Sequence, residues 1–145
     1  MITEARLGEF RMRVSLPGAL TTGVKAIQSI PYNCQLKSVN VNSRAAGITG
    51  SQIVDIQKAA AGSGAALASI FSGAGKANTS NGPFQADSLG PFTAGATTFA
   101  KNDIVAINVT QVHSGTPAND TTIDLIFQRF KGVNLHGSPV LGETE

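Results

Sequence analysis

Charged residues are scarce in this 145-residue chain. Lys, Arg, Asp and Glu make up only 14% of its residues. A typical soluble domain carries roughly 25%. Small polar and apolar side chains must therefore cover the surface, which favours a protein in lasting contact with neighbours. An ordinary β-domain rich in small residues is the alternative. The net charge is +2, with no basic patch interleaved with aromatic residues, so nucleic acid is not an expected partner.

Cysteine is almost absent, since Cys34 is the single thiol in the chain. It can form no internal disulfide, so the fold does not depend on an oxidising compartment. We expect a small, buried and unreactive thiol. No apolar run approaches the ~20 residues of a membrane-spanning helix, and the first residues lack the layout of a signal peptide. We therefore expect the protein to be made in the cytosol and to have no membrane partner.

The chain also lacks the residue patterns of catalysis and cofactor binding. Gly62-Ser63-Gly64 does not have the frame of a nucleophile elbow. In Gly73-Ala74-Gly75-Lys76, the next residue is Ala77 where a phosphate-binding loop needs Ser or Thr. His113 and His136 lie far apart in the sequence, with no metal-ligand spacing. We therefore expect no enzyme, no cofactor and no metal.

What the sequence does contain is alternation of apolar and polar residues with a period of two, the pattern of half-buried strands. Such runs occupy residues 10–16, 24–31, 37–44, 51–58, 103–112 and 121–130. The last two flank a loop rich in Gly, Pro, Asn and Asp, which predicts that they pair as a β-hairpin. No helical pattern lies between the runs. We therefore predict an all-β fold, an antiparallel jelly roll or β-sandwich of about eight strands with extended arms at both ends.

Residues 59–82 are the most biased segment, rich in Ala, Gly and Ser. Only the island at residues 67–71 has side chains able to fill a core, so we predict a long surface loop on either side of it. Farther on, Phe84, Phe92 and Phe99 are expected to plug gaps at the rim of the core rather than to stack on ligands.

The two ends of the chain are predicted to be arms, residues 1–9 and 131–145, that flank one domain at residues 10–130. The C-terminal arm holds glycine, proline and isolated aliphatic residues, which cannot form a core element alone. We expect it to lie along another subunit that buries its aliphatic side chains, namely Val133, Leu135, Val140 and Leu141. A free tail is the alternative. Arg11 and Arg13 fall on the solvent side of the first strand. An ordinary hydrated strand face is the expected role for this pair, and recognition of an acidic partner is the alternative.

Several segments, taken in order, carry a resemblance to a known family. They start with Ile30-Pro31-Tyr32-Asn33-Cys34 and continue through residues 36–41, 53–58, 69–71, 99–109 and 122–127. In this order they resemble the small jelly-roll virion proteins of tailed bacteriophages, which decorate the capsid or serve as head fibres and tail tips. Where that family often has Gly-Asp before the penultimate strand, this chain has Asn102-Asp103.

The resemblance implies a capsid decoration protein without enzymatic activity, made in the host cytoplasm and placed on the capsid surface of the virion. It further implies a homotrimer that binds the major capsid protein and stabilises the shell. Arg11, Arg13 and the four aliphatic residues of the C-terminal arm are the candidate contacts. The alternative is a tail or fibre-tip protein, or another carbohydrate-binding β-sandwich module. The absence of tryptophan and the single tyrosine, Tyr32, count against that alternative.

Overall fold

The computed structural model describes residues 8–62, 64, 66–72, 76–78, 87–89 and 91–130, with the backbone alone at 76–78 and 87–89. These residues form ten β-strands and no helix, so none of their segments is a helix that could span a membrane. The strands are β1 (Glu9–Ala19), β2 (Gly23–Ser29), β3 (Cys34–Ala45), β4 (Gln52–Ala59), β5 (Ala68–Ser69), β6 (Lys76–Asn78), β7 (Asp87–Leu89), β8 (Thr98–Phe99), β9 (Ile104–Gln111) and β10 (Asn119–Arg129).

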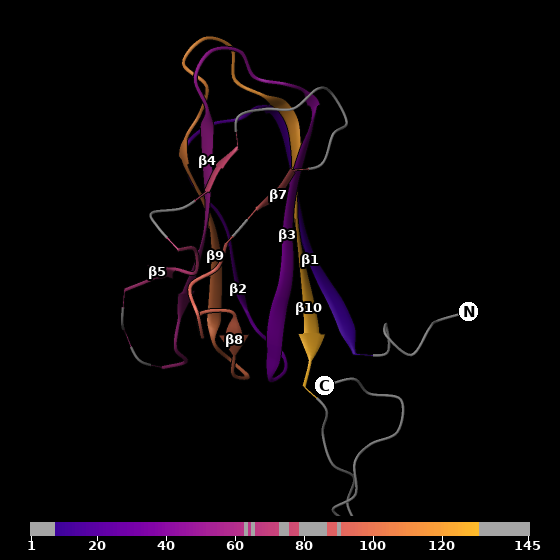
Figure 1. Ribbon diagram of the computed structural model, residues 1–145, viewed down its shortest axis with the longest axis vertical. Coiled ribbons are helices and arrows are strands. Elements are labelled where there is room, and N and C mark those ends of the chain that lie inside the picture. The colour runs from indigo at the N-terminus through magenta and orange to yellow at the C-terminus, as the bar shows by residue number, and fades with distance from the viewer. Residues whose placement is uncertain are drawn as a thin grey trace, which may run out of the picture.

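The strands form two antiparallel sheets that face each other, which confirms the predicted all-β class and β-sandwich (Figure 1). Sheet A has the order β1-β10-β3-β7, and β8 also pairs with β3. Sheet B has the order β2-β9-β4-β5, and β6 also pairs with β4. The chain changes sheet at each connection from β1 to β4 and again from β9 to β10. Neighbouring strands in each sheet are therefore mostly distant in sequence.

The predicted β-hairpin of residues 103–112 and 121–130 is wrong. These runs are β9 and β10, and they lie in different sheets, β9 between β2 and β4 and β10 between β1 and β3. Their connection crosses from one sheet to the other and is held by a backbone bridge between Ile48 and Thr116. Alternation identifies the side chains that face the core, such as Ile107 and Leu125, but not the sheet that supplies them.

The core lies between the sheets and is filled by the inward side chains of both. Phe127 is at its centre, stacked on Phe10 with ring centroids 4.9 Å apart and edge-on to Phe99 at 5.8 Å. Phe99 is fully buried, and Phe92 is half-buried and stacks on Phe71 at 5.6 Å, so both fill space in the core or at its rim as expected. Phe84 lies outside the described residues.

The predicted long loop around residues 67–71 is wrong in part. Ile70 and Phe71 are buried as expected, and the adjoining β5 pairs with β4. However, β6 lies within the predicted loop of residues 59–82 and also pairs with β4. Strands pair through backbone hydrogen bonds and need no large side chain. A short strand can therefore form in a segment of small residues, where the sequence shows no alternation that would predict it. The two ends, residues 1–7 and 131–145, lie outside the described residues.

Candidate interaction surfaces

The outer face of sheet A is polar and charged. Cross-strand partners project from the same side of a sheet, so the register identifies the outward rows across β1, β10 and β3. These rows are Glu9–Gln128–Gln35, Arg11–Ile126–Ser38, Arg13–Asp124–Asn40 and Ser15–Thr122–Asn42. Ile126 is the only apolar member of these rows. This face is suited to stay in contact with water.

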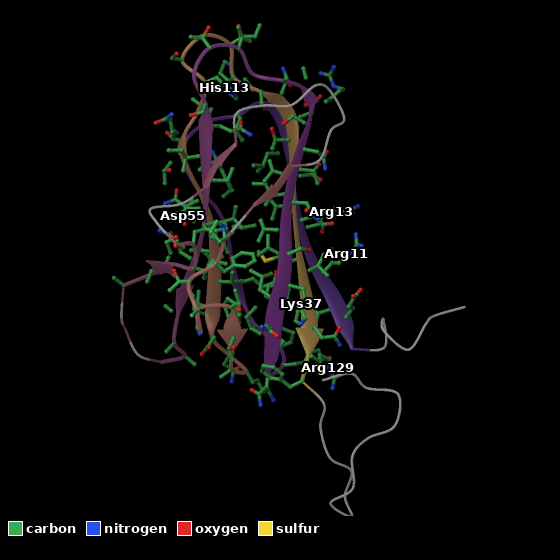
Figure 2. All side chains as sticks on the ribbon, viewed as in Figure 1. Arg11, Arg13, Lys37, Asp55, His113 and Arg129 are labelled. Atoms are coloured by element: carbon green, nitrogen blue, oxygen red, sulfur yellow. The ribbon has the colours of Figure 1, made fainter. Side chains whose placement is uncertain are left out.

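Arg11 and Arg13 lie on this face, as predicted, and Figure 2 shows them on the outside of β1. Arg11 Nη1 is 3.1 Å and Arg13 Nη2 is 3.5 Å from the same oxygen, Asp124 Oδ2. Asp124 is buried on the central strand β10, whereas more than half of each arginine side chain is exposed. Its other oxygen, Oδ1, has no hydrogen-bond partner among the described residues. Two arginines therefore share one carboxylate, and the three side chains together carry a net positive charge.

The outer face of sheet B is almost without charge. Its rows across β2, β9 and β4 are Val24–Asn108–Asp55, Ile27–Ala106–Gln57 and Ser29–Ile104–Ala59. Asp55 is the only ionisable member, and it is buried and accepts a hydrogen bond from Ser69 Oγ at 2.5 Å. Val24 and Ile27, on the edge strand, are 49% and 64% exposed. These rows can lose water at low cost, because their one ionisable residue, Asp55, is already buried and hydrogen-bonded to Ser69, so a contact dehydrates no exposed charge in them.

Strict alternation along residues 24–31 would place Val24 and Ile27 on opposite sides of the strand, so this apolar edge could not be predicted from the sequence. The register of β2 against β9 shifts between Val24 and Ala26, which leaves Lys25 as an extra residue. Such a bulge reverses the alternation, so both aliphatic side chains face outward. Alternation along residues 51–58 places Asp55 on the outward side, where it lies, but its burial and its bond from Ser69 could not be predicted from the sequence.

One end of the sandwich has a hollow of about 310 Å³ beside the last residues of β10. Its walls are formed by Pro31, Tyr32, Asn33, Lys101, Arg129 and Phe130. The guanidinium carbon of Arg129 lies 4.2 Å from the centroid of the Tyr32 ring. Asn33 Oδ1 accepts a hydrogen bond from the Lys101 backbone N–H at 2.8 Å, and Asn33 O accepts one from Phe130 N–H at 3.1 Å. These bonds join three segments that are far apart in the sequence.

The other end of the sandwich carries an exposed ion pair and a buried histidine. Asp120 Oδ1 accepts a hydrogen bond from Gly18 N–H at 2.7 Å, and Oδ2 lies 2.5 Å from Arg44 Nε. The Gly18 bond, followed by the Arg44 bond, lowers the pKa of the Asp120 carboxyl. His113 is buried, and neither ring nitrogen has a hydrogen-bond partner among the described residues. A Cβ atom at Gly47 would lie 2.0 Å from His113 Nδ1, so only glycine fits against this ring.

The described residues contain no group of three or more His, Cys, Asp or Glu side chains that could hold a metal ion. Cys34 is buried in the core, as predicted. Burial raises the pKa of its thiol to about 11, with a further contribution from the negative charge of Asp103. Asp103 itself accepts hydrogen bonds from Ala61 N–H at 3.0 Å and Ala100 N–H at 2.8 Å. His136 and the four aliphatic candidates, Val133, Leu135, Val140 and Leu141, lie outside the described residues.

Comparisons with protein-family models, with curated proteins and with solved structures found no significant match. We therefore infer a function from the surfaces and the strand order of this chain.

Proposed function

We propose that this chain is a non-enzymatic virion protein that decorates a bacteriophage capsid. In this proposal it binds the major capsid protein on the outer surface of the shell, as a homotrimer, and stabilises the shell. The observation that carries the proposal is the outer face of sheet B, whose rows across β2, β9 and β4 include exposed Val24 and Ile27 and no exposed charge. A lasting contact with a neighbour would bury such a face at little cost in hydration.

We also propose that the sandwich is a jelly roll. The support is the strand order, in which the first strand pairs with the last, β1 with β10, and the second with the last but one, β2 with β9. This pairing results when a long two-stranded ribbon wraps around a core, with its two halves in opposite sheets. Jelly rolls are double-sheet folds of two Greek keys and are common in viral capsids.

The size of the outer face of sheet B indicates that other surfaces of the protein must also contribute to binding the shell. Three strands about 4.8 Å apart, each with about seven residues of 3.3 Å, present a face of roughly 300 Å². A stable protein interface buries about 800 Å² on each partner. The face is therefore too small to hold the shell alone. Contacts between subunits would supply the remainder, with the C-terminal arm and its aliphatic residues Val133, Leu135, Val140 and Leu141 as the proposed contribution.

The proposal is tested by sedimentation of the protein with empty shells assembled from the major capsid protein of the same genome. Ile27→Asp puts a charge on the apolar face, and Ser15→Asp is the matched control on the other edge strand, where the face is already polar. We expect the wild-type protein and Ser15→Asp to sediment with the shells and Ile27→Asp to remain in solution. Equal thermal unfolding of the two variants shows that both fold. Absence of wild-type protein from the pelleted shells contradicts the decoration role.

A further inference from the structure

The free edge of sheet B is the outer side of β2, a strand that pairs with β9 alone among the described strands. Just past the end of β2, Ile30 N–H donates to Asp103 O at 2.8 Å, and this pair continues the register of β2 against β9. Hydrogen-bonded and non-bonded pairs alternate along an antiparallel ladder. Gln28 therefore turns its backbone groups toward β9, whereas Ile27 and Ser29 turn theirs toward the free edge.

The second half of β2 has none of the features that protect an edge strand. A bare edge is a template for a further strand, and charged residues, proline and bulges prevent such pairing. The bulge at Lys25 lies in the first half of β2. The Lys25 ammonium group donates to Thr21 Oγ1 at 2.7 Å and to Thr22 O at 3.2 Å, toward the start of the strand. Residues 26–29, Ala-Ile-Gln-Ser, hold no charge and no proline, so this half is open to strand addition.

The free edge of sheet A, formed by β1, is protected. Arg129 N–H donates to Gly8 O at 2.8 Å, and this pair continues the register of β1 against β10. The same alternation turns the backbone groups of Glu9, Arg11 and Arg13 toward the free edge. A strand added there would lie beside three charged side chains. The two edges of the sandwich therefore differ in the partner that they accept.

We propose that the second half of β2 binds an extended, uncharged segment of the major capsid protein as an added strand of sheet B. Such a segment would form backbone hydrogen bonds with Ile27 and Ser29 and place an aliphatic residue beside the Ile27 side chain, which is 64% exposed. This inference rests on the proposed function, because the edge borders the outer face of sheet B. That face, roughly 300 Å², is smaller than a stable interface needs. Strand addition extends the same contact around the edge of the sheet.

A second copy of this chain matches the edge less well than a capsid segment does. Antiparallel pairing of β2 with β2 of another subunit relates two subunits by a twofold axis, so it does not produce the proposed trimer. Pairing of β2 with β1 of another subunit would place the charged side chains of that β1, such as Arg11 and Arg13, next to Ile27. The uncharged edge is therefore better suited to a different chain.

The test is a titration of the full chain with empty shells assembled from the major capsid protein of the same genome, with the unbound protein measured after sedimentation. Ser29→Pro removes the N–H donor at the free edge of β2, a position where an edge strand accepts proline. Ser15→Pro is the matched control, because it removes the N–H donor at the free edge of β1. Both serines are exposed, and they precede the similar pairs Ile30-Pro31 and Leu16-Pro17. We expect Ser29→Pro to bind roughly tenfold more weakly than wild type and Ser15→Pro to bind as wild type does.

Amide exchange of the wild-type protein is a second measurement, which does not require a variant to fold. The protein bound to shells is exposed to deuterated water for a set time and then released, and the protons that remain are measured by NMR. We expect the amides of Ile27 and Ser29 to exchange fast in the free protein and as slowly as the Gln28 amide on the shells. The Gln28 amide already faces β9 and serves as the internal reference.

Three results overturn strand addition while they leave the decoration role intact. The first is a Ser29→Pro variant that folds, as judged by thermal unfolding, and binds as tightly as wild type. The second is faster exchange of Ile27 and Ser29 than of Gln28 on the shells, because the shell then covers the face without adding a strand. The third is slow exchange of both amides in the free protein, because another segment of this chain or a second copy then occupies the edge. Absence of wild-type binding contradicts the decoration role itself and, with it, strand addition by the capsid protein.

Discussion

The two outer faces of this sandwich have the same backbone architecture but opposite chemistry. On sheet A, the central strand β10 presents Asp124, whose carboxylate lies beside Arg11 and Arg13 of β1. On sheet B, the equivalent central position is Ala106, fully buried between Ile27 and Gln57. The inward side chains of both sheets are mostly apolar, with the hydroxyl pair of Ser43 and Thr121 as an exception in sheet A, so the core does not distinguish the two faces. The outward residues therefore determine which face stays hydrated and which face can be dehydrated in contact with a neighbour.

The largest expected effect comes from a charge placed on the apolar face. Ala106→Asp puts a carboxylate without a counterion at a fully buried position, and we expect a loss of about 2 to 3 kcal/mol in the free energy of unfolding. Thr110→Asp is the control, since Thr110 is on the same strand and the same side but is exposed. Urea denaturation measures both variants. Equal losses would mean that the two positions do not differ in their tolerance of charge.

A smaller effect is expected on the charged face, where the double variant Arg11→Gln/Arg13→Gln leaves the Asp124 carboxylate buried without a cation. The expected loss is about 1 to 2 kcal/mol at low salt, and each single variant should cost much less because the other arginine remains. Arg44→Gln, which removes a partner of the more exposed Asp120, is the control and should cost much less than the double variant. If each single variant costs as much as the double, the two arginines do not share the carboxylate.

The core and its inward pattern could be predicted from the sequence, because burial on one side of a strand imposes a period of two wherever the strand pairs. Alternation along residues 103–112 places Val105, Ile107 and Val109 on one side of the strand, and all three are fully buried. The pairing could not be predicted. It depends on contacts between segments that are distant in the sequence, and alternation is identical for a hairpin and for two strands in facing sheets.

The surfaces were predictable only where local alternation was unbroken. Arg11 and Arg13 were placed correctly, but their shared partner Asp124 follows from the pairing of β1 with β10. The bulge at Lys25, which turns Val24 outward, has no Gly or Pro signal in the sequence at that position. The hollow draws on three segments, near residues 32, 101 and 129, that are brought together only by the fold.

The smallest expected effect concerns Asp120, at the start of β10. Its pKa is lowered by bonds from Gly18 and Arg44, so it stabilises the fold above the unfolded-state pKa, near 3.8, and loses this contribution as the pH falls through its folded-state pKa. Asp120→Asn removes the charge, and asparagine tolerates the φ of 52° at this position. We expect a lower melting temperature than wild type at pH 7 and a smaller difference at pH 2. An equal difference at both pH values would show that the charge has no part in the effect.

The most direct test of the contrast between the two faces is hydrogen–deuterium exchange on the protein alone and bound to empty capsid shells. Both edge strands, β1 and β2, have one side unpaired by any other described strand, so each can report a new contact. We predict that exchange slows in β2 and the neighbouring part of β9, where Val24, Ile27 and Ala106 lie, and stays unchanged in β1. Slower exchange in β1 with an unchanged β2 would contradict it, because the charged face of sheet A would then be the surface that meets the shell.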